Sequence, residues 1–181
     1  MVDDALILSK FTDDKTREEA FNLLINKYQQ KIYWQIRRIV INHDDADDVV
    51  QEVFIKIWKN LASFRQDAQL FTWLYRIATN ESLTFIKKKQ ARNNISLDDL
   101  SLKMSESLNT DPYFTGNEIE KKLQQALLGL PEKQRLVFNM RYYDDLKFQE
   151  ISDILGTSVG ALKASYHLAA KKIEQFVKTN D

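Results

Sequence analysis

Apolar side chains recur at three- and four-residue steps through three stretches in the first half of the chain, residues 20–40, 46–61 and 72–86. This is the spacing of one face of an α-helix, so each stretch predicts a long amphipathic helix. Asn42 offers a capping oxygen ahead of the second stretch, and the lysines at 87–89 favour the negative end of the third helix dipole. The first half is therefore predicted to be a helical bundle.

The periodicity decays in the middle of the chain, where Ser, Asn and Asp are frequent and Pro112 and Gly116 occur. This segment is too irregular to predict a long helix and too long for a compact turn. We therefore expect a flexible linker over residues 93–116 that joins two domains, residues 1–92 and 117–181.

Helical periodicity returns at Ile119 and continues to Tyr143, interrupted at residues 129–131. Pro131 suits the first turn of a new helix. Backbone N–H groups of the first turn have no partner within the helix, so the missing N–H of proline costs nothing there. Two further helices are therefore expected in this stretch.

A short helical pattern over residues 146–155 is followed by Gly156 and by a longer pattern over 159–176. Two helices joined by a glycine-containing turn predict a helix-turn-helix, whose second helix enters the DNA major groove. The positions that face outward on this helix are Ser158, Lys163, Ala164, His167, Leu168 and Lys171, with Lys172 and Lys178 nearer to phosphate. A helical hairpin with no DNA role fits the same pattern.

Composition supports an all-α fold of two small helical domains. The 181 residues include 4 Gly, 2 Pro and no Cys, whereas straight-chain helix formers are abundant. The absence of Cys removes disulfides and thiolate sites, and two isolated His make a metal centre improbable. The sequence has no apolar run long enough to span a bilayer and no signal-peptide pattern, so we expect a cytoplasmic protein.

Charge is segregated along the chain although the formal net charge is zero. Residues 21–43 carry four basic side chains and no acidic one, and residues 64–92 carry six basic and two acidic. Acidic side chains outnumber basic ones in residues 1–20, 44–63 and 93–118. Such a chain can present one face to an anionic polymer and another to a basic partner. The same pattern also fits several helix faces that are only solvated.

Three motifs, in this order and spacing, resemble an extracytoplasmic-function sigma factor of bacterial RNA polymerase. They are DADDVVQEVFIKIWKNL, SFRQDAQLFTWLYRIATNESLTFIKKK and LGLPEKQRLVFNMRYYDDLKFQEISDILGTSVGALKASYHLAAKKI, in residues 45–61, 63–89 and 128–173. The resemblance implies the minimal two-domain form, with region 2 and region 4 joined by a flexible linker. It also implies promoter DNA, the clamp coiled coil and flap of core RNA polymerase, and a membrane-anchored anti-sigma factor as partners.

The resemblance implies that the acid-rich helix of region 2 docks on the clamp coiled coil of the largest polymerase subunit. An acidic, partly apolar face suits a partner helix rich in arginine, although acids also favour a helix N-terminus by themselves. The implied polymerase-binding residues are Asp47, Asp48, Gln51, Glu52, Phe54, Ile55 and Trp58.

The resemblance places promoter melting at the loop that follows and at the next helix. A base flipped out of the minus-ten element needs polar groups that read its edge and an apolar wall, and the backbone needs cations. The implied residues are Phe64, Arg65, Gln66, Asp67, Gln69 and Thr72 in the loop, with Arg76, Asn80, Lys87 and Lys88 for the backbone. We expect Trp73 to lie in the core. Leu70 and Phe71 stand where many relatives carry a more polar pair, which leaves the base preference open.

The second helix of the helix-turn-helix is implied to read the minus-thirty-five element. Leu168 and Ala170 stand where many relatives carry Arg, so binding should depend on Lys163, Lys171 and Lys172. This predicts modest promoter affinity in the absence of polymerase.

Two other classes of protein share some of these features. A conventional helix-turn-helix regulator would bind its operator without polymerase. A metal-dependent phosphohydrolase built around His43 and Asp44 lacks converging ligands, because the other histidine, His167, belongs to the other predicted domain. We therefore expect no catalysis, no cofactor, no metal and no small-molecule substrate.

Overall fold

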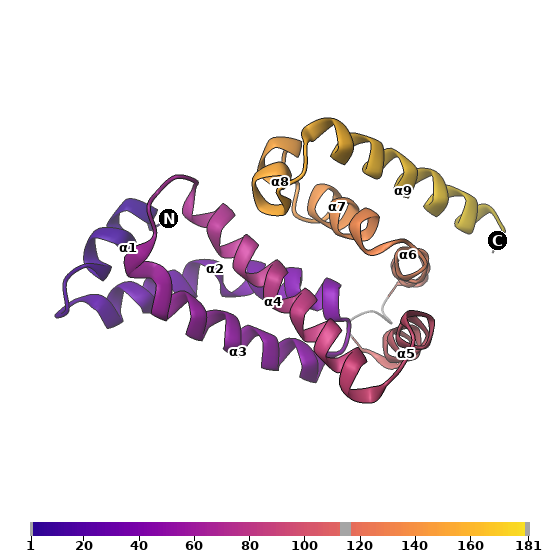
Figure 1. The fold of residues 1–181 in the computed structure, drawn as a ribbon, viewed down its shortest axis with the longest axis horizontal. Coiled ribbons are helices and arrows are strands. Elements are labelled where there is room, and N and C mark those ends of the chain that lie inside the picture. Colours follow the sequence, from indigo (N-terminus) through magenta and orange to yellow (C-terminus); the bar gives the residue numbers. More distant parts are fainter. Residues whose placement is uncertain (1, 113–116, 180–181) are drawn as a thin grey trace.

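The computed structural model describes residues 2–112 and 117–179, and these residues are helical, with turns and loops but no strand. Four helices form the first part: α1 (Asp4–Phe11), α2 (Arg17–Val40), α3 (His43–Asn60) and α4 (Leu70–Asn93). A short 3₁₀ turn, η1 (Leu61–Ser63), follows α3. Helices α2, α3 and α4 pack against one another, and α1 lies against α2 (Figure 1). The predicted all-α fold is confirmed.

The predicted helices of the first half are present with slightly wider bounds, and α1 was not predicted. Their apolar faces meet in one core that contains Leu24, Ile32, Val53 and Leu74, all fully buried or nearly so. At the start of α3 the Asn42 side chain accepts a hydrogen bond from the backbone N–H of Asp45. This is the capping role expected of Asn42, and it satisfies one of the free donors of the first turn.

The expected irregular linker is wrong over much of its length, because α5 (Leu97–Thr110) occupies its centre. Ser96 and Asp99 form a reciprocal capping box at its start, and Leu100, Met104 and Leu108 are buried against the core of the first domain. The Ser and Asp residues that suggested irregularity cap the helix, as Ser96 and Asp99 do, face solvent, as Asp98 does, or form a buried ion pair, as Asp111 does. Residues 113–116 of the predicted linker lie outside the described residues.

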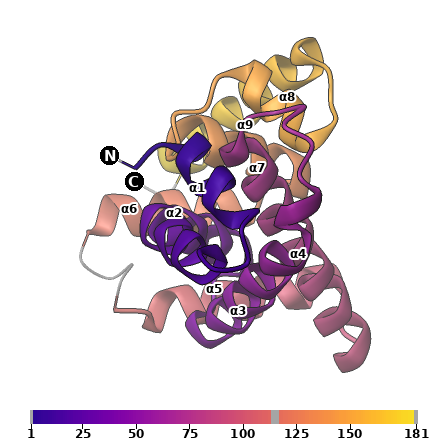
Figure 2. The same ribbon diagram turned by 90° about the vertical axis from the view of Figure 1, so that its left-hand side faces the viewer.

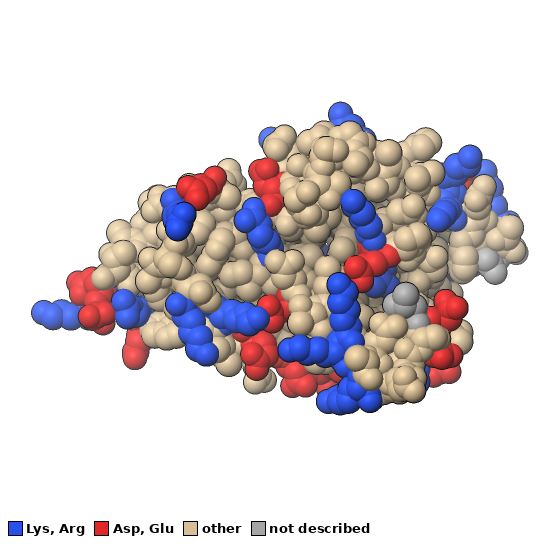
Figure 3. All heavy atoms as spheres, in the orientation of Figure 1, with Lys and Arg blue, Asp and Glu red and all other residues tan. Residues whose placement is uncertain are grey.

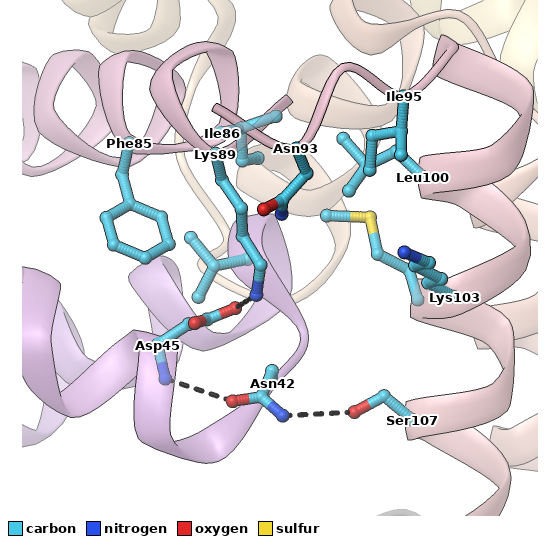
Figure 4. A pocket seen from close by; sticks show the side chains of 12 residues that line it. Asn42, Asp45, Phe85, Ile86, Lys89, Asn93, Ile95, Leu100, Lys103 and Ser107 are labelled. Atoms are coloured by element: carbon cyan, nitrogen blue, oxygen red, sulfur yellow. Dashed lines mark hydrogen bonds and ion pairs between the residues drawn. The ribbon is translucent and has the colours of Figure 1, made fainter. Parts of the chain in front are cut away.

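Polar contacts at the C-terminal end of α5 join it to the first domain (Figure 4). The Asn42 side-chain amide donates to Ser107 Oγ at 3.4 Å, and Lys89 forms an ion pair with Asp45 beside it. A pocket of about 230 Å³ remains between α5 and the ends of α2 and α4. Further along, the buried Arg37 guanidinium pairs with Asp111.

The second part contains α6 (Glu118–Leu128), α7 (Glu132–Tyr142), α8 (Phe148–Leu155) and α9 (Val159–Thr179). Gly156 ends α8 with a φ of 63°, a left-handed conformation that glycine adopts without a Cβ penalty. Ile151 and Leu162 are fully buried on either side of this turn and hold α8 against α9. The predicted helix-turn-helix is therefore present.

The two parts of the chain pack against each other. Helix α8 lies along the first half of α4, on the side opposite α3, and α7 contacts α2 (Figures 1 and 2). Tyr75 of α4 is buried among Val137, Met140 and Ile151. The domain boundaries at 92 and 117 stay a prediction, because α5 packs on both the first domain and α6. No helix among the described residues is long and apolar enough to cross a membrane.

Candidate polymerase and promoter interfaces

The side chains predicted for minus-thirty-five recognition are exposed on α9 or, for Ser158, immediately before it. Leu162, Ala169 and Ile173 are buried toward α6, α7 and α8, and this orients the opposite face to solvent. The exposed residues are Ser158, Lys163, Ala164, His167, Leu168, Lys171 and Lys172. Leu168 is 47% exposed, unusually high for a large apolar side chain.

The loop between η1 and α4 holds the side chains predicted to read a flipped base. The Phe64 ring packs on Trp73 with ring centroids 5.2 Å apart, and both rings are half-buried. Arg65, Gln66 and Asp67 point into solvent, and so does Gln69. The loop therefore combines exposed polar groups with an aromatic wall, which is the chemistry that base capture requires.

Thr72 differs from the other predicted loop residues. It lies in the first turn of α4, 4% exposed, on the face that packs into the core. A base cannot reach this hydroxyl in the present arrangement, so Thr72 does not belong to the candidate surface. The periodicity predicts a helix that begins at about residue 72, whereas α4 begins two residues earlier, at Leu70.

The backbone-contacting residues predicted on α4, namely Arg76, Asn80, Lys87 and Lys88, are all exposed. Arg76 is nevertheless engaged, because its guanidinium donates a 2.5 Å hydrogen bond to the backbone carbonyl of Asp153 on α8. In this arrangement α8 therefore occupies part of the predicted minus-ten surface. Basic side chains are scattered among acidic ones on the face that Figure 3 shows, without one continuous basic patch.

The acidic helix α3 borders a shallow groove of about 460 Å³ shared with α4. Asp48, Gln51, Glu52 and Ile55 form the α3 side, and Lys88 belongs to the α4 side. The predicted polymerase face and the predicted DNA face therefore meet in one groove. Of the remaining predicted residues, Asp47 is exposed on the same helix.

Phe54 and Trp58 have a second role in the fold. The Trp58 ring meets Phe11 edge-on at 5.4 Å between centroids and Phe21 at 5.0 Å, and Phe54 meets Phe21 at 6.3 Å. This aromatic cluster joins α1, α2 and α3. Trp58 keeps 37% of its surface exposed, so one side remains open to a partner.

A buried ion pair that the sequence analysis missed joins the two domains. Arg38 of α2 pairs with Asp144, which follows α7, and their side chains are only 11% and 8% exposed. The Arg38 guanidinium also lies over the Tyr143 ring, 5.0 Å from its centroid. Burial raises the pKa of Asp144 to about 6, although the charge of Arg38 opposes this rise. Because 106 residues separate the partners, no local spacing pattern could have indicated the pair.

Comparisons with known proteins agree with this geometry. Residues 24–92 match the family described as Sigma-70 region 2, and residues 120–173 match Sigma-70, region 4. The ECF RNA polymerase sigma factor SigW of Bacillus subtilis is 32% identical over 161 residues, covering 84% of this chain and 86% of that protein. The ECF RNA polymerase sigma-E factor of Escherichia coli K12 is 32% identical over 172 residues, covering 91% and 90%.

Two solved structures share the fold at 20% sequence identity. One is CnrH in complex with the cytosolic domain of CnrY, with a TM-score of 0.71 and coverage of 98% of this chain and 99% of that one. The other is the sigma factor RpoE in complex with the anti-sigma factor NepR from Bartonella quintana, with a TM-score of 0.70 and coverage of 89% and 98%. Together with the sequence relatives, the helix-turn-helix and the exposed α3 and α9 faces, these matches establish that the chain belongs to the ECF sigma factors of the sigma-70 family.

Proposed function

We propose that this sigma factor binds core RNA polymerase through α3, opens promoters with the loop and helix α4, and reads the minus-thirty-five element with α9. The observation that carries the proposal is the helix-turn-helix, whose second helix exposes six predicted DNA-contacting side chains, with a seventh, Ser158, just ahead of it. In this scheme the chain supplies recognition and strand capture, whereas polymerase supplies the chemistry. We accordingly assign no catalytic activity to it and expect it to act in the cytoplasm.

The α3 groove supports the assignment of polymerase binding. Exposed carboxylates of Asp48 and Glu52 flank the apolar Ile55, so a partner helix can pair its cations while it buries apolar surface. Arginine is the expected partner, because a guanidinium pairs with a carboxylate through two hydrogen bonds. The clamp coiled coil of the largest polymerase subunit is the partner that the family resemblance implies, with the flap as the contact for region 4.

The loop of residues 64–69 supports the assignment of strand capture. A flipped base would stack beside Phe64 while Arg65, Gln66 or Gln69 reads its polar edge, and Lys87 and Lys88 would follow the backbone along α4. This requires α8 to leave Arg76, so productive binding needs a different placement of the two domains.

An anti-sigma factor is the proposed regulator. Two solved proteins of the same fold occur in complexes with CnrY and with the anti-sigma factor NepR. By analogy, we propose a membrane-anchored partner that covers the polymerase-binding faces of both domains. Such a partner would keep the exposed Ile55 and Leu168 out of contact with polymerase and DNA.

Run-off transcription with purified core polymerase and a pooled promoter library tests this function. We expect new start sites that share upstream elements only when the protein is added. Glu52→Lys should abolish binding to core polymerase, and Lys163→Ala should weaken promoter selection but leave core binding intact. Lys15→Ala, an exposed substitution outside every proposed surface, is the matched control. Specific duplex binding without any effect on initiation would support a conventional regulator instead.

A further inference from the structure

A cleft of about 720 Å³ opens where the end of α4, α5, the start of α7 and α9 meet. One wall is apolar and is formed by Ile86, Leu100, Met104, Leu128 and Leu130. This volume exceeds what a single inorganic ion needs and falls in the range of small-molecule sites. The wall suits a planar, weakly polar group.

Arg135 of α7 lines the same cleft and is 8% exposed. Its Nε is buried without a hydrogen-bond partner, and its guanidinium forms no ion pair within the described part of the chain. Burial lowers the pKa of Arg135, which reflects the cost of holding this charge out of water. The charge of Glu132, one turn earlier on α7, offsets part of this cost. A buried guanidinium without a hydrogen-bonded anion is unfavourable, so an anion bound at this point would be stabilised.

Other features make the cleft favourable for an anion. Lys87 from α4 and Lys172 from α9 line it, and α7 begins there at Pro131, where no side chain caps the helix. The free N–H groups and the dipole of a helix N-terminus attract phosphate. Asp98 and Glu132 also line the cleft, but both are exposed, and the three cations exceed them in charge.

We propose that this cleft binds a phosphate-bearing nucleotide, with its phosphates on Arg135, Lys87 and Lys172 and its base against the apolar wall. The shared chemistry is that of a nucleoside phosphate, either free or at the end of a nucleic acid. Because the lining residues come from both domains and from α5, a bound nucleotide would join them and favour the packed arrangement. Lys87 and Lys172 are also predicted to contact promoter DNA, whereas Arg135 belongs to the cleft alone. Dependence on Arg135 therefore distinguishes nucleotide binding from promoter binding.

Isothermal titration of the full-length protein with ADP, in the absence of polymerase, tests the site. We expect saturable binding to one site and a loss of affinity of about tenfold to a hundredfold in Arg135→Gln, the effect of one charge-assisted hydrogen bond. Pyrophosphate should bind more weakly than ADP, because it leaves the apolar wall empty. Absence of ADP binding together with absence of oligonucleotide binding, or equal affinity in the wild type and Arg135→Gln, would overturn the proposal.

Variants on exposed positions keep the test independent of folding. Lys172→Gln should weaken ADP binding about threefold or more, by analogy with other single phosphate contacts, whereas Lys178→Gln, on the same helix but outside the cleft, should not. Glu132→Gln tests the alternative that Arg135 serves only the fold. If Arg135 binds phosphate, removing the nearby Glu132 carboxylate should strengthen ADP binding. If Glu132 is only a structural partner of Arg135, the variant should lose stability and ADP should not restore it.

A short single-stranded oligonucleotide with a 5′-triphosphate distinguishes the two sources. Binding of ADP that depends on Arg135 assigns a free nucleotide. Binding of the oligonucleotide alone, with the same dependence on Arg135, still supports the phosphate site but assigns its ligand to a nucleic-acid end.

Discussion

Replacing Arg38 with Met should release region 4 from region 2. The substitution removes the cation but retains most of the side-chain volume, so Asp144 is left in a site where it is only 8% exposed. Breaking a buried ion pair by removing one partner costs about 3 to 5 kcal/mol. Asp144 can escape part of this cost by taking up a proton. Because its pKa in the packed arrangement is already about 6, protonation at pH 7 costs about 1.4 kcal/mol, which is the smallest penalty expected.

A penalty of at least about 1.4 kcal/mol lowers the ratio of packed to separated molecules at least tenfold, since about 1.4 kcal/mol corresponds to a factor of ten. The chain contains no cysteine, so Lys59→Cys and Gln175→Cys introduce a unique pair of labels on exposed positions of α3 and α9. Single-molecule energy transfer between the labels should shift to low efficiency in Arg38→Met. Arg141→Met is the matched control, because its partner Asp145 is 93% exposed and a surface pair contributes about 0 to 1 kcal/mol.

The reasoning would be refuted if Arg38→Met and the wild type gave the same transfer distribution. An equal shift in Arg141→Met would also contradict it, because the effect would then arise from loss of a positive charge in general and not from the buried pair.

Three further outcomes are expected. The pKa of Asp144 is raised from 3.8 to about 6, so protonation favours the packed arrangement: this contribution is complete below about pH 4 and is lost as the pH rises through 6. Lowering the pH from about 7.5 to 5.5 should increase the ratio of packed to separated molecules about fourfold in the same energy-transfer assay. Leu162→Ala should cost about 2 to 5 kcal/mol in urea unfolding, because Leu162 is fully buried, whereas exposed Leu168→Ala should change stability by less than about 0.5 kcal/mol. Leu168→Arg should add one phosphate contact, seen in fluorescence anisotropy as tighter promoter binding and a salt slope steeper by about one.

Helical periodicity predicted most of the fold, because the long helices bury one face and so repeat apolar side chains every three or four residues. The same spacing is present at Leu100, Met104 and Leu108, but the Ser and Asp residues around them indicated a loop. Local composition and long-range packing therefore gave opposite indications for α5, and packing on the core decided the structure.

The candidate interfaces were predictable where function requires exposed side chains on a regular helix, as on α9 and α3. Prediction failed where the outcome depended on distant contacts. Thr72 was assigned to a loop, but α4 begins before it and turns it into the core. Arg38 and Asp144 come together only after both domains have folded, so their pairing has no signature along the chain.

The helix α5 also sets how far apart the two DNA-binding domains can reach. Its 14 residues span about 21 Å as a helix, at about 1.5 Å per residue, but would span about 46 Å if extended, at about 3.3 Å per residue. Unwinding it therefore lengthens the connection by about 25 Å. Its burial against region 2 makes this change cooperative, because Leu100, Met104 and Leu108 leave the core together. Unwinding of α5 would thus give the chain a longer tether, and the promoter spacing that it can bridge would change in a step.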